Sequence, residues 1–493
     1  MRKAMIKRLQ TGVPGLDEIL GGGLPELSFN LLAGAPGSGK TSLAHQMMFA
    51  MATPERPALY FTVLGEPPLK MLRYQQQFDY FDIDKLNRSI RFINLAEEAG
   101  LGSLDKVLRH IVAEVETHEP GFVFVDSFRS LTLSSPNEGS TFFSLQRFAQ
   151  ELGVLMASWQ ATTFLIGEYA ELHEPNPLFT VSDGLIWLRQ SVQGNSMVRK
   201  IEILKMRGQA TQPGSHTFRM SANGIQVFAV PPLSSYPKLA PEFSAKARLS
   251  MGIPGLDEML GGGLPRGYFL LVAGPSGSGK SILAGAFLDE GARVGEIGII
   301  AAFERRWIHS RGEHVAALVR AGQISVVDTE SSDLSVEELG LLLMAEIRRL
   351  DARRVVIDSL SGFELALAPS LRKDFRQSLA RMLAALASTG ATVLMTVALE
   401  NHDAGFHLSP DGAALLSDAI IVQRYVETDG RRQRVLSVLK VRSSDHSSTL
   451  HRYHIDDEGM RIGEPLAARA WTHGRRLSRQ QNSRAVTSGF GMT

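Results

Sequence analysis

The chain has 493 residues, no cysteine, and 52 lysine and arginine residues against 51 aspartate and glutamate residues. The absence of cysteine excludes disulfides, thiolate metal sites and a cysteine nucleophile, and the near-zero net charge gives no sign of the bulk attraction that nucleic acid or anionic lipid would need. Neither a membrane-spanning apolar run nor the apolar stretch of a signal peptide is visible, so we expect a soluble cytoplasmic protein without a membrane partner.

A segment near the start of the chain is repeated in its second half. Residues 12–25 read GVPGLDEILGGGLP and residues 252–265 read GIPGLDEMLGGGLP, so twelve of the fourteen positions are identical. The motifs that follow recur in the same order, which indicates an internal duplication. We therefore expect two copies of one domain, over residues 1–232 and 248–465.

Two further segments are expected to lie outside these domains. Residues 233–247 carry Pro237 and Pro241 among several serines, a composition typical of a semi-stiff extended linker. Residues 466–493 are rich in arginine and contain no acidic residue, and we expect them to form a disordered basic tail. The tail could contact nucleic acid or a membrane, but a solvated chain end is the favoured interpretation.

The first apolar strand of each half runs into a glycine-rich loop. Residues 34–41 read GAPGSGKT and residues 274–281 read GPSGSGKS, and both fit the pattern G-x-x-x-x-G-K-[ST]. In such a loop, successive backbone N–H groups converge on phosphate oxygens, and the next helix directs its positive end at the same charge. The lysine reaches the β- and γ-phosphates, and the last hydroxyl binds Mg²⁺. The predicted ATP-binding residues are Gly34, Ala35, Pro36, Gly37, Ser38, Gly39, Lys40 and Thr41, and Gly274, Pro275, Ser276, Gly277, Ser278, Gly279, Lys280 and Ser281.

Hydrolysis also needs a group that activates water. In the second half, Glu304 follows the strand that ends near Ala302, where a general base would stand. In the first half the aligned residue is Leu64, and Glu66 lies two positions later, on the same face of an extended chain but roughly 6–7 Å further along. Because losing a general base typically costs about 10²–10⁴ in rate, we expect the second half to hydrolyse ATP and the first half mainly to bind it.

A carboxylate at the end of a later strand completes each predicted magnesium site. The apolar runs 122–125 and 354–357 end in Asp126 and Asp358, and each aspartate is followed by serine. In P-loop enzymes such an aspartate holds Mg²⁺ directly or through water. Capping of a following helix is an alternative role, and it is compatible with the first. The predicted metal ligands are Thr41, Asp126, Ser281 and Asp358.

Apolar runs alternate with helical stretches in both halves. Residues 122–125 and 354–357 are continuous hydrophobic strands, as expected for a parallel sheet that is covered on both faces, and residues 29–33 form a further short run before the first glycine-rich loop. The regular alternation of strand and helix predicts an open α/β sheet in each copy.

Together these features resemble the KaiC family of the RecA superfamily. The repeated leader, the two P-loops, the two strand-end Asp-Ser pairs and two late K-x-R motifs carry the resemblance, which covers about residues 8–465. It implies two tandem RecA-like domains, each a mostly parallel sheet with helices on both faces, stacked as two rings in a homo-hexamer with ATP between neighbouring subunits. It also implies that each K-x-R motif extends to the γ-phosphate of the next subunit; the alternative is a solvated charge pair at a strand end. The predicted catalytic residues are Lys40, Glu66, Lys205, Arg207, Lys280, Glu304, Lys440 and Arg442.

The chain departs from the pattern of this family at the autophosphorylation site. Ala414 and Leu415 stand where the family has a Ser-Thr pair, which excludes that phosphotransfer at these positions. Ser409 and Ser417 are the nearest hydroxyls, so a serine/threonine kinase that labels itself or a partner is an alternative function. A RecA-like DNA recombination or repair ATPase is a further alternative, although near-neutral charge gives it no support. The favoured function is an ATP-hydrolysing regulatory or signalling protein whose protein partner the sequence does not identify.

Overall fold

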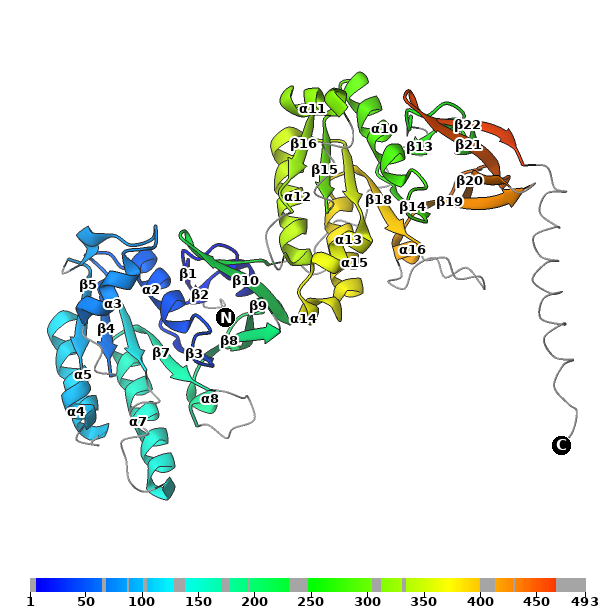
Figure 1. Ribbon diagram of the computed structural model, residues 1–493. Helices are drawn as coiled ribbons and strands as arrows, with labels where there is room; N and C mark the ends of the chain where they lie inside the picture. The colour runs from blue at the N-terminus through cyan, green and yellow to red at the C-terminus, as the bar shows by residue number, and fades with distance from the viewer. Residues whose placement is uncertain are drawn as a thin grey trace, which may run out of the picture. The chain divides into compact units, whose positions relative to one another are not determined.

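The chain divides into two units, Met1–Pro232 and Leu233–Thr493, called domain 1 and domain 2 below (Figure 1). The structure is a computed structural model, and the residues that it describes are 6–63, 68–86, 88–100, 104–127, 138–169, 177–193, 195–229, 247–303, 312–329, 334–399, 413–428 and 431–466.

Domain 1 alternates strands and helices and ends in antiparallel strands. Its described elements are β1 (Arg8–Leu9), α1 (Leu16–Ile19), β2 (Leu24–Pro25), β3 (Phe29–Gly34), α2 (Lys40–Met51), β4 (Ala58–Thr62), α3 (Pro68–Gln75), η1 (Ile83–Lys85), β5 (Ile90–Asn94), α4 (Ala96–Gly100), α5 (Leu104–His118), β6 (Phe122–Asp126), α7 (Glu138–Ser158), β7 (Thr162–Glu168), α8 (Pro177–Val181), β8 (Gly184–Gln193), β9 (Ser196–Met206), β10 (Ser215–Ser221) and β11 (Gly224–Val227). Within the described residues they form a nine-stranded sheet of order β11-β10-β9-β8-β3-β7-β6-β4-β5. The strands from β8 to β5 in this order are parallel, and β9, β10 and β11 extend the sheet antiparallel.

Both faces of the domain 1 sheet are covered by apolar side chains of helices. Successive residues of β3 and β4 point to opposite faces, so that Leu32 and Tyr60 join one core with α2, while Leu31 and Phe61 join another core with α5 and α7. Every residue of β3 and β4 is buried, which explains why both strands are mostly apolar and do not alternate between apolar and polar residues.

Domain 2 repeats this architecture. Its described elements are β12 (Arg248–Leu249), α9 (Leu256–Met259), β13 (Leu264–Pro265), β14 (Phe269–Gly274), α10 (Lys280–Arg293), β15 (Gly298–Ala302), α11 (Gly312–Arg320), β16 (Ile324–Val327), α12 (Val336–Leu350), β17 (Arg354–Asp358), α13 (Leu360–Ala366), α14 (Pro369–Arg372), α15 (Phe375–Ala387), β18 (Thr392–Ala398), α16 (Ala413–Leu416), β19 (Ala419–Thr428), β20 (Arg431–Val441), β21 (His451–Asp456) and β22 (Gly459–Pro465). The sheet of the described residues has the order β16-β15-β17-β18-β14-β19-β20-β21-β22 and is parallel from β16 to β19. The predicted α/β class with two tandem RecA-like domains is confirmed (Figure 1).

The topology places both phosphate-binding loops at the carboxyl edge of a sheet. In each domain the loop follows the central strand, β3 or β14, and the strand that ends in Asp126 or Asp358, β6 or β17, lies two places away. Ligands of open parallel sheets bind at this edge, where the loops after the strands meet.

The segments expected between and after the domains are almost wholly outside the described residues. Of the expected linker, residues 233–247, and the expected tail, residues 466–493, only residues 247 and 466 are among the described residues. Within the described part of the chain, no helix combines the length and the apolar character that crossing a bilayer requires.

Candidate nucleotide-binding sites

Both phosphate-binding loops contain glycines whose backbone conformations favour glycine. Gly37 and Gly39 have φ of 76° and 100°, and their counterparts Gly277 and Gly279 have φ of 75° and 99°. A Cβ on Gly279 would also lie only 2.5 Å from Cδ1 of Ile455. Among the described residues no side chain caps the first turn of α2 or α10, so the backbone N–H groups there remain available to an anion. The two loops therefore fit phosphate groups.

The lysine of each loop folds back onto the loop itself. Nζ of Lys40 donates to the carbonyl oxygen of Ala35 at 2.8 Å, and Nζ of Lys280 donates to Gly274 at 2.9 Å and to Pro275 at 3.0 Å. Burial lowers the pKa of Lys40. Each ammonium group is thus held inside its loop, where phosphate oxygens would replace the carbonyl oxygens as its partners.

In domain 1 the predicted metal ligands are in direct contact. Oγ1 of Thr41 donates to Oδ2 of Asp126 at 2.9 Å, and the hydroxyl of Tyr60 donates to the same oxygen at 2.8 Å. Burial raises the pKa of Asp126, and these two hydrogen bonds oppose that shift. The hydroxyl and the carboxylate are suitable oxygen ligands for Mg²⁺. Nothing in the sequence pattern indicated Tyr60, because it lies in the middle of an apolar strand.

In domain 2 the equivalent aspartate has a different partner. Oδ1 of Asp358 accepts a hydrogen bond of 2.5 Å from Oγ1 of Thr396 in β18. Ser281 is the second residue of α10, as Thr41 is of α2, but in the described part of domain 2 it forms no hydrogen bond with Asp358. Ser359, and not Asp358, caps the following helix, since its side chain accepts from the backbone N–H of residue 362. The aspartate is therefore not needed as a helix cap.

The loop of domain 2 has additional support that the sequence analysis missed. Oγ of Ser278 donates to Oε1 of Gln423 at 2.9 Å, and the hydroxyl of Tyr453 donates to the carbonyl oxygen of Ser278 at 2.6 Å. Gln423 is fully buried and follows the apolar run 419–422, so a single polar residue in a buried strand was the available signal.

The lysines of the two K-x-R motifs donate hydrogen bonds to carbonyl oxygens at the C-terminal ends of short helices. Nζ of Lys205 donates to the carbonyl oxygens of Thr180 at 3.0 Å and Ser182 at 2.5 Å, at the end of α8. Nζ of Lys440 donates to the carbonyl oxygen of Ser417 at 2.6 Å, at the end of α16. Burial lowers the pKa of both lysines, and the neighbouring arginine of each motif adds to the shift. A cation at a helix C-terminus is a favourable arrangement.

The arginines of the motifs pair with aspartates and stay accessible. Arg207 lies 3.1 Å from Asp183 and Arg442 lies 3.0 Å from Asp418, and the other carboxylate oxygen of each aspartate accepts the N–H of the first residue of the central strand. The arginine side chains are 60% and 51% exposed. Within one chain the motifs are therefore anchored at the base of a hairpin, with guanidinium groups that a second molecule could reach.

Some of the predicted residues lie outside the described part of the chain. These are Leu64, Glu66, Glu304 and Ser409. Ser417 is described and is fully buried, so its hydroxyl is not accessible to a phosphoryl donor in this conformation.

Comparison of the sequence with known proteins finds relatives that are also described as ATPases or clock proteins. The family model of the KaiC ATPases matches residues 9–231 and 249–467. The chain is 28% identical over 472 residues to the circadian clock oscillator protein KaiC of Rippkaea orientalis (strain PCC 8801 / RF-1), covering 93% of this chain and 89% of that protein. It is 28% identical over 480 residues to the circadian clock protein KaiC3 of Synechocystis sp. (strain ATCC 27184 / PCC 6803 / Kazusa), with coverage of 94% and 92%. The KaiC of Prochlorococcus marinus (strain MIT 9313) is 27% identical over 476 residues, with coverage of 94% of each chain.

Proposed function

The chain belongs to the KaiC ATPase family, and from that premise we propose that it is an ATP-hydrolysing regulatory protein in which domain 2 performs most of the hydrolysis. The observation that carries the proposal is that both domains have the same arrangement. Each has a glycine-rich loop, a lysine whose ammonium group is hydrogen-bonded to that loop, and a strand-end aspartate that accepts a hydrogen bond from a hydroxyl group. Membership of the family implies nucleotide binding, and this arrangement supports ATP with Mg²⁺ as the bound pair.

Different residues of each site would bind the phosphates and the metal ion. Lys40 and Lys280 would contact the β- and γ-phosphates, because their ammonium groups already lie inside the loops. Thr41 with Asp126, and Ser281 with Asp358, would hold the metal ion. Bound Mg²⁺ would supply positive charge that offsets the negative charge of the phosphates.

The proposed difference in hydrolysis between the two domains depends on one residue in each. This residue follows the strand that lies beside the aspartate-bearing strand. Glu304 follows β15 and is suited to accept a proton from water, whereas the aligned residue after β4 is Leu64. Since β15 and β4 lie beside the aspartate-bearing strands in the same register, the two positions are equivalent within their domains. We therefore assign domain 1 mainly to binding and domain 2 to turnover.

We further propose that the active form is a two-ring homo-hexamer in which the K-x-R motif of one subunit completes the site of the next. The exposed guanidinium groups of Arg207 and Arg442 support this assignment. An arginine delivered in trans stabilises the charge of the transition state and is worth about 10³–10⁵ in rate. Changes in these contacts during turnover would be read by a protein partner.

Phosphate release by the purified full-length protein tests the division of labour. Glu304→Gln should slow release by about 10²–10⁴, because it removes the base and keeps the shape. Leu64→Ala should leave release nearly unchanged, and Lys40→Ala should remove one bound nucleotide per chain while most of the turnover remains. Equal losses in Glu304→Gln and Leu64→Ala would contradict the assignment.

A further inference from the structure

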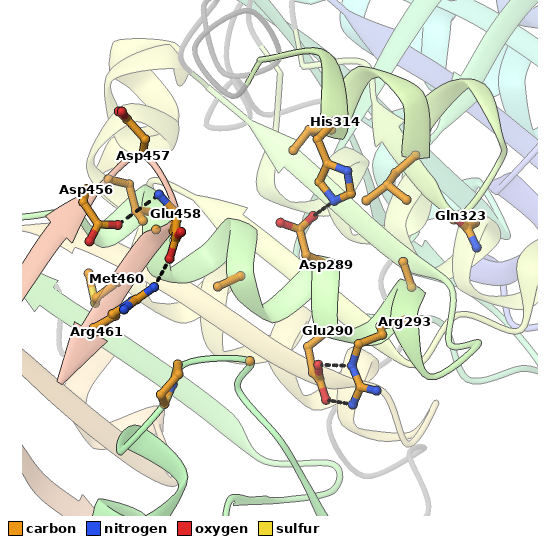
Figure 2. Close-up of a pocket in the computed structure, with 18 residues that line it drawn as sticks. Asp289, Glu290, Arg293, His314, Gln323, Asp456, Asp457, Glu458, Met460 and Arg461 are labelled. Carbon is orange, nitrogen blue, oxygen red and sulfur yellow. Dashed lines mark hydrogen bonds and ion pairs between the residues drawn. The ribbon is translucent and has the colours of Figure 1, made fainter.

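Domain 2 contains a large cavity on the side of α10 that faces away from the sheet. Figure 2 shows this cavity, which has a volume of about 1070 Å³ and lies among α10, α11 and the turn between β21 and β22. Ile282, Val315, Leu318 and Met460 give it an apolar floor. The cavity is separate from the phosphate-binding loop, none of whose residues lines it.

The rim of this cavity carries an excess of negative charge. Its carboxylates are Asp289, Glu290, Asp456, Asp457 and Glu458, and its cationic groups are Arg293, Arg461 and, when protonated, His314. Glu290 pairs with Arg293 at 2.7 Å and Glu458 pairs with Arg461, so both arginines are already neutralised by neighbours in sequence. Asp289 lies 3.9 Å from Nε2 of His314, and Asp456 and Asp457 add two further carboxylates. The rim is therefore negative overall and attracts a cationic occupant.

The corresponding place in domain 1 is filled by the chain itself. After α3, residues 76–86 run over the outer side of α2, whereas in domain 2 only residues 321–323 separate α11 from β16. Phe81 packs on Phe49 of α2 with ring centroids 5.1 Å apart, and the backbone N–H of Asp79 donates to the carbonyl oxygen of Ala222, in the turn between β10 and β11, at 2.9 Å. This added segment therefore covers the outer side of α2 with aromatic side chains.

The helices of the two domains differ at matching positions. Gln46, six residues after Lys40, hydrogen-bonds with both the N–H and the carbonyl oxygen of Ile225, which ties α2 to the β10–β11 hairpin. The residue six places after Lys280 is Ala286, which lines the cavity and lacks such a clamp. Among the described residues of domain 2 there is thus neither a covering segment nor a clamp, and the cavity is lined by acidic side chains.

We propose that the basic C-terminal tail, residues 467–493, docks in this acidic groove of domain 2. The tail contains five arginines and no acidic residue, and Trp471 stands among them as an aromatic group of the kind that packs on α2 in domain 1. Its arginines are Arg469, Arg475, Arg476, Arg479 and Arg484. Guanidinium groups can pair with the aspartates and one large ring can cover the apolar residues, so the tail is complementary to the site in charge and in apolar character.

The length of the tail is sufficient for docking. The strand β22 has seven residues and spans about 23 Å at roughly 3.3 Å per residue, and the acidic turn lies at its start. The described chain ends at Leu466, and Arg475 follows nine residues later, which allows a reach of about 30 Å. The arginines at 475, 476 and 479 can therefore return to the turn from the end of the strand that precedes them.

Disulfide trapping tests the proposal cleanly, because the natural chain contains no cysteine. The test variant is the full-length chain with Asp457→Cys in the β21–β22 turn and Ser478→Cys in the tail. The matched control carries Asn223→Cys in the β10–β11 turn of domain 1 with the same tail cysteine. Both turn positions are exposed, so neither substitution should prevent folding.

Under mild oxidation the test variant should form its bridge at least about tenfold faster than the control. Reversing the tail charge with Arg475→Glu, Arg476→Glu and Arg479→Glu should bring the rate down to that of the control, and so should high salt. A bridge within one chain and a bridge between two copies both support the proposal. Equal rates at the two turns, or a fast bridge that charge reversal does not slow, would overturn it.

Discussion

The phenol of Tyr60 donates a hydrogen bond of 2.8 Å to Oδ2 of Asp126. Tyr60 is the third residue of β4, and the third residue of β15 in domain 2 is Ile300, which has no polar group. There the equivalent aspartate is held by Thr396, from the strand on its other side. The two domains therefore orient matching carboxylates from opposite sides, and this difference allows each site to be perturbed alone.

Tyr60→Phe should weaken binding of ATP with Mg²⁺ to domain 1 by roughly three- to tenfold, because it removes one hydrogen bond that orients the carboxylate. The measurement is nucleotide affinity in a Lys280→Ala background, where only the loop of domain 1 binds. Thr396→Val is the matched control: it should have no effect there, and should lower affinity in a Lys40→Ala background. Equal effects of either substitution in both backgrounds would contradict the assignment.

Co-expression of two inactive variants tests whether the K-x-R motif acts between subunits. Lys280→Ala damages the loop and Arg442→Ala damages the arginine, so each variant alone should release little phosphate. In a mixed ring, a loop of the second variant can face an arginine of the first, and random mixing restores about a quarter of the domain 2 sites. Phosphate release equal to the mean of the two separate variants would show that Arg442 does not act in trans.

Gln46→Ala should lower the free energy of unfolding of domain 1 by about 1–3 kcal/mol, because the backbone N–H and carbonyl groups of buried Ile225 lose their partner. Urea unfolding, followed by the fluorescence of Trp159 and Trp187 after Trp307 and Trp471 have been replaced by phenylalanine, reports this domain. The exposed Gln77→Ala is the control and should change the free energy by less than about 0.5 kcal/mol. A similar small effect for Gln46→Ala would show that the clamp contributes little.

His45 should make domain 1 sensitive to acid. Burial lowers the pKa of His45 to about 3; its ring stacks on Tyr60 at 4.5 Å, and neither ring nitrogen has a hydrogen-bond partner among the described residues. An unfolded histidine has a pKa of about 6.5, so below that pH the unfolded state takes up a proton that the folded state does not. The free energy of unfolding should therefore fall by about 2 kcal/mol between pH 7 and pH 5 on account of this residue.

His45→Phe keeps the stacking and removes the titrating group, so the loss of stability between pH 7 and pH 5 should shrink by that amount. The same fluorescence-detected urea unfolding at the two pH values provides the measurement. If the parent and His45→Phe lose stability equally on acidification, the buried imidazole is not the source of the acid sensitivity.

The sequence was sufficient to predict those parts of the site that are contiguous in the chain. The loops 34–41 and 274–281 lie where the pattern placed them, and the apolar runs before Asp126 and Asp358 are buried parallel strands. These features depend on local chemistry, since glycine conformation, a helix start and a continuous apolar run are each set by neighbouring residues.

The partners of these residues could not be predicted, because they come from strands that pack beside the site only after folding. Tyr60 and Thr396 are ordinary strand residues in sequence, and their hydroxyls matter only because β4 and β18 adjoin the aspartate-bearing strands. The groove of domain 2 depends on a segment that is present in one copy and missing in the other. Comparing the loop lengths of the two copies in the sequence would have revealed the extra segment. It would not have revealed the charge of the surface that is left uncovered in domain 2.

The lysine caps on α8 and α16 have a consequence for the proposed ring. The ammonium group of Lys440 donates hydrogen bonds to the carbonyl oxygens of Ser417 and Ala414 of its own subunit, around the end of α16. A triphosphate bound by the adjacent subunit would compete with these carbonyl oxygens for the same ammonium group. One ammonium group cannot form strong hydrogen bonds with both partners at once. Nucleotide arrival at one site would therefore loosen the helix end in the subunit that lends the lysine, while the opposite neighbour is unaffected. Occupancy would be transmitted around the ring in a single rotational direction.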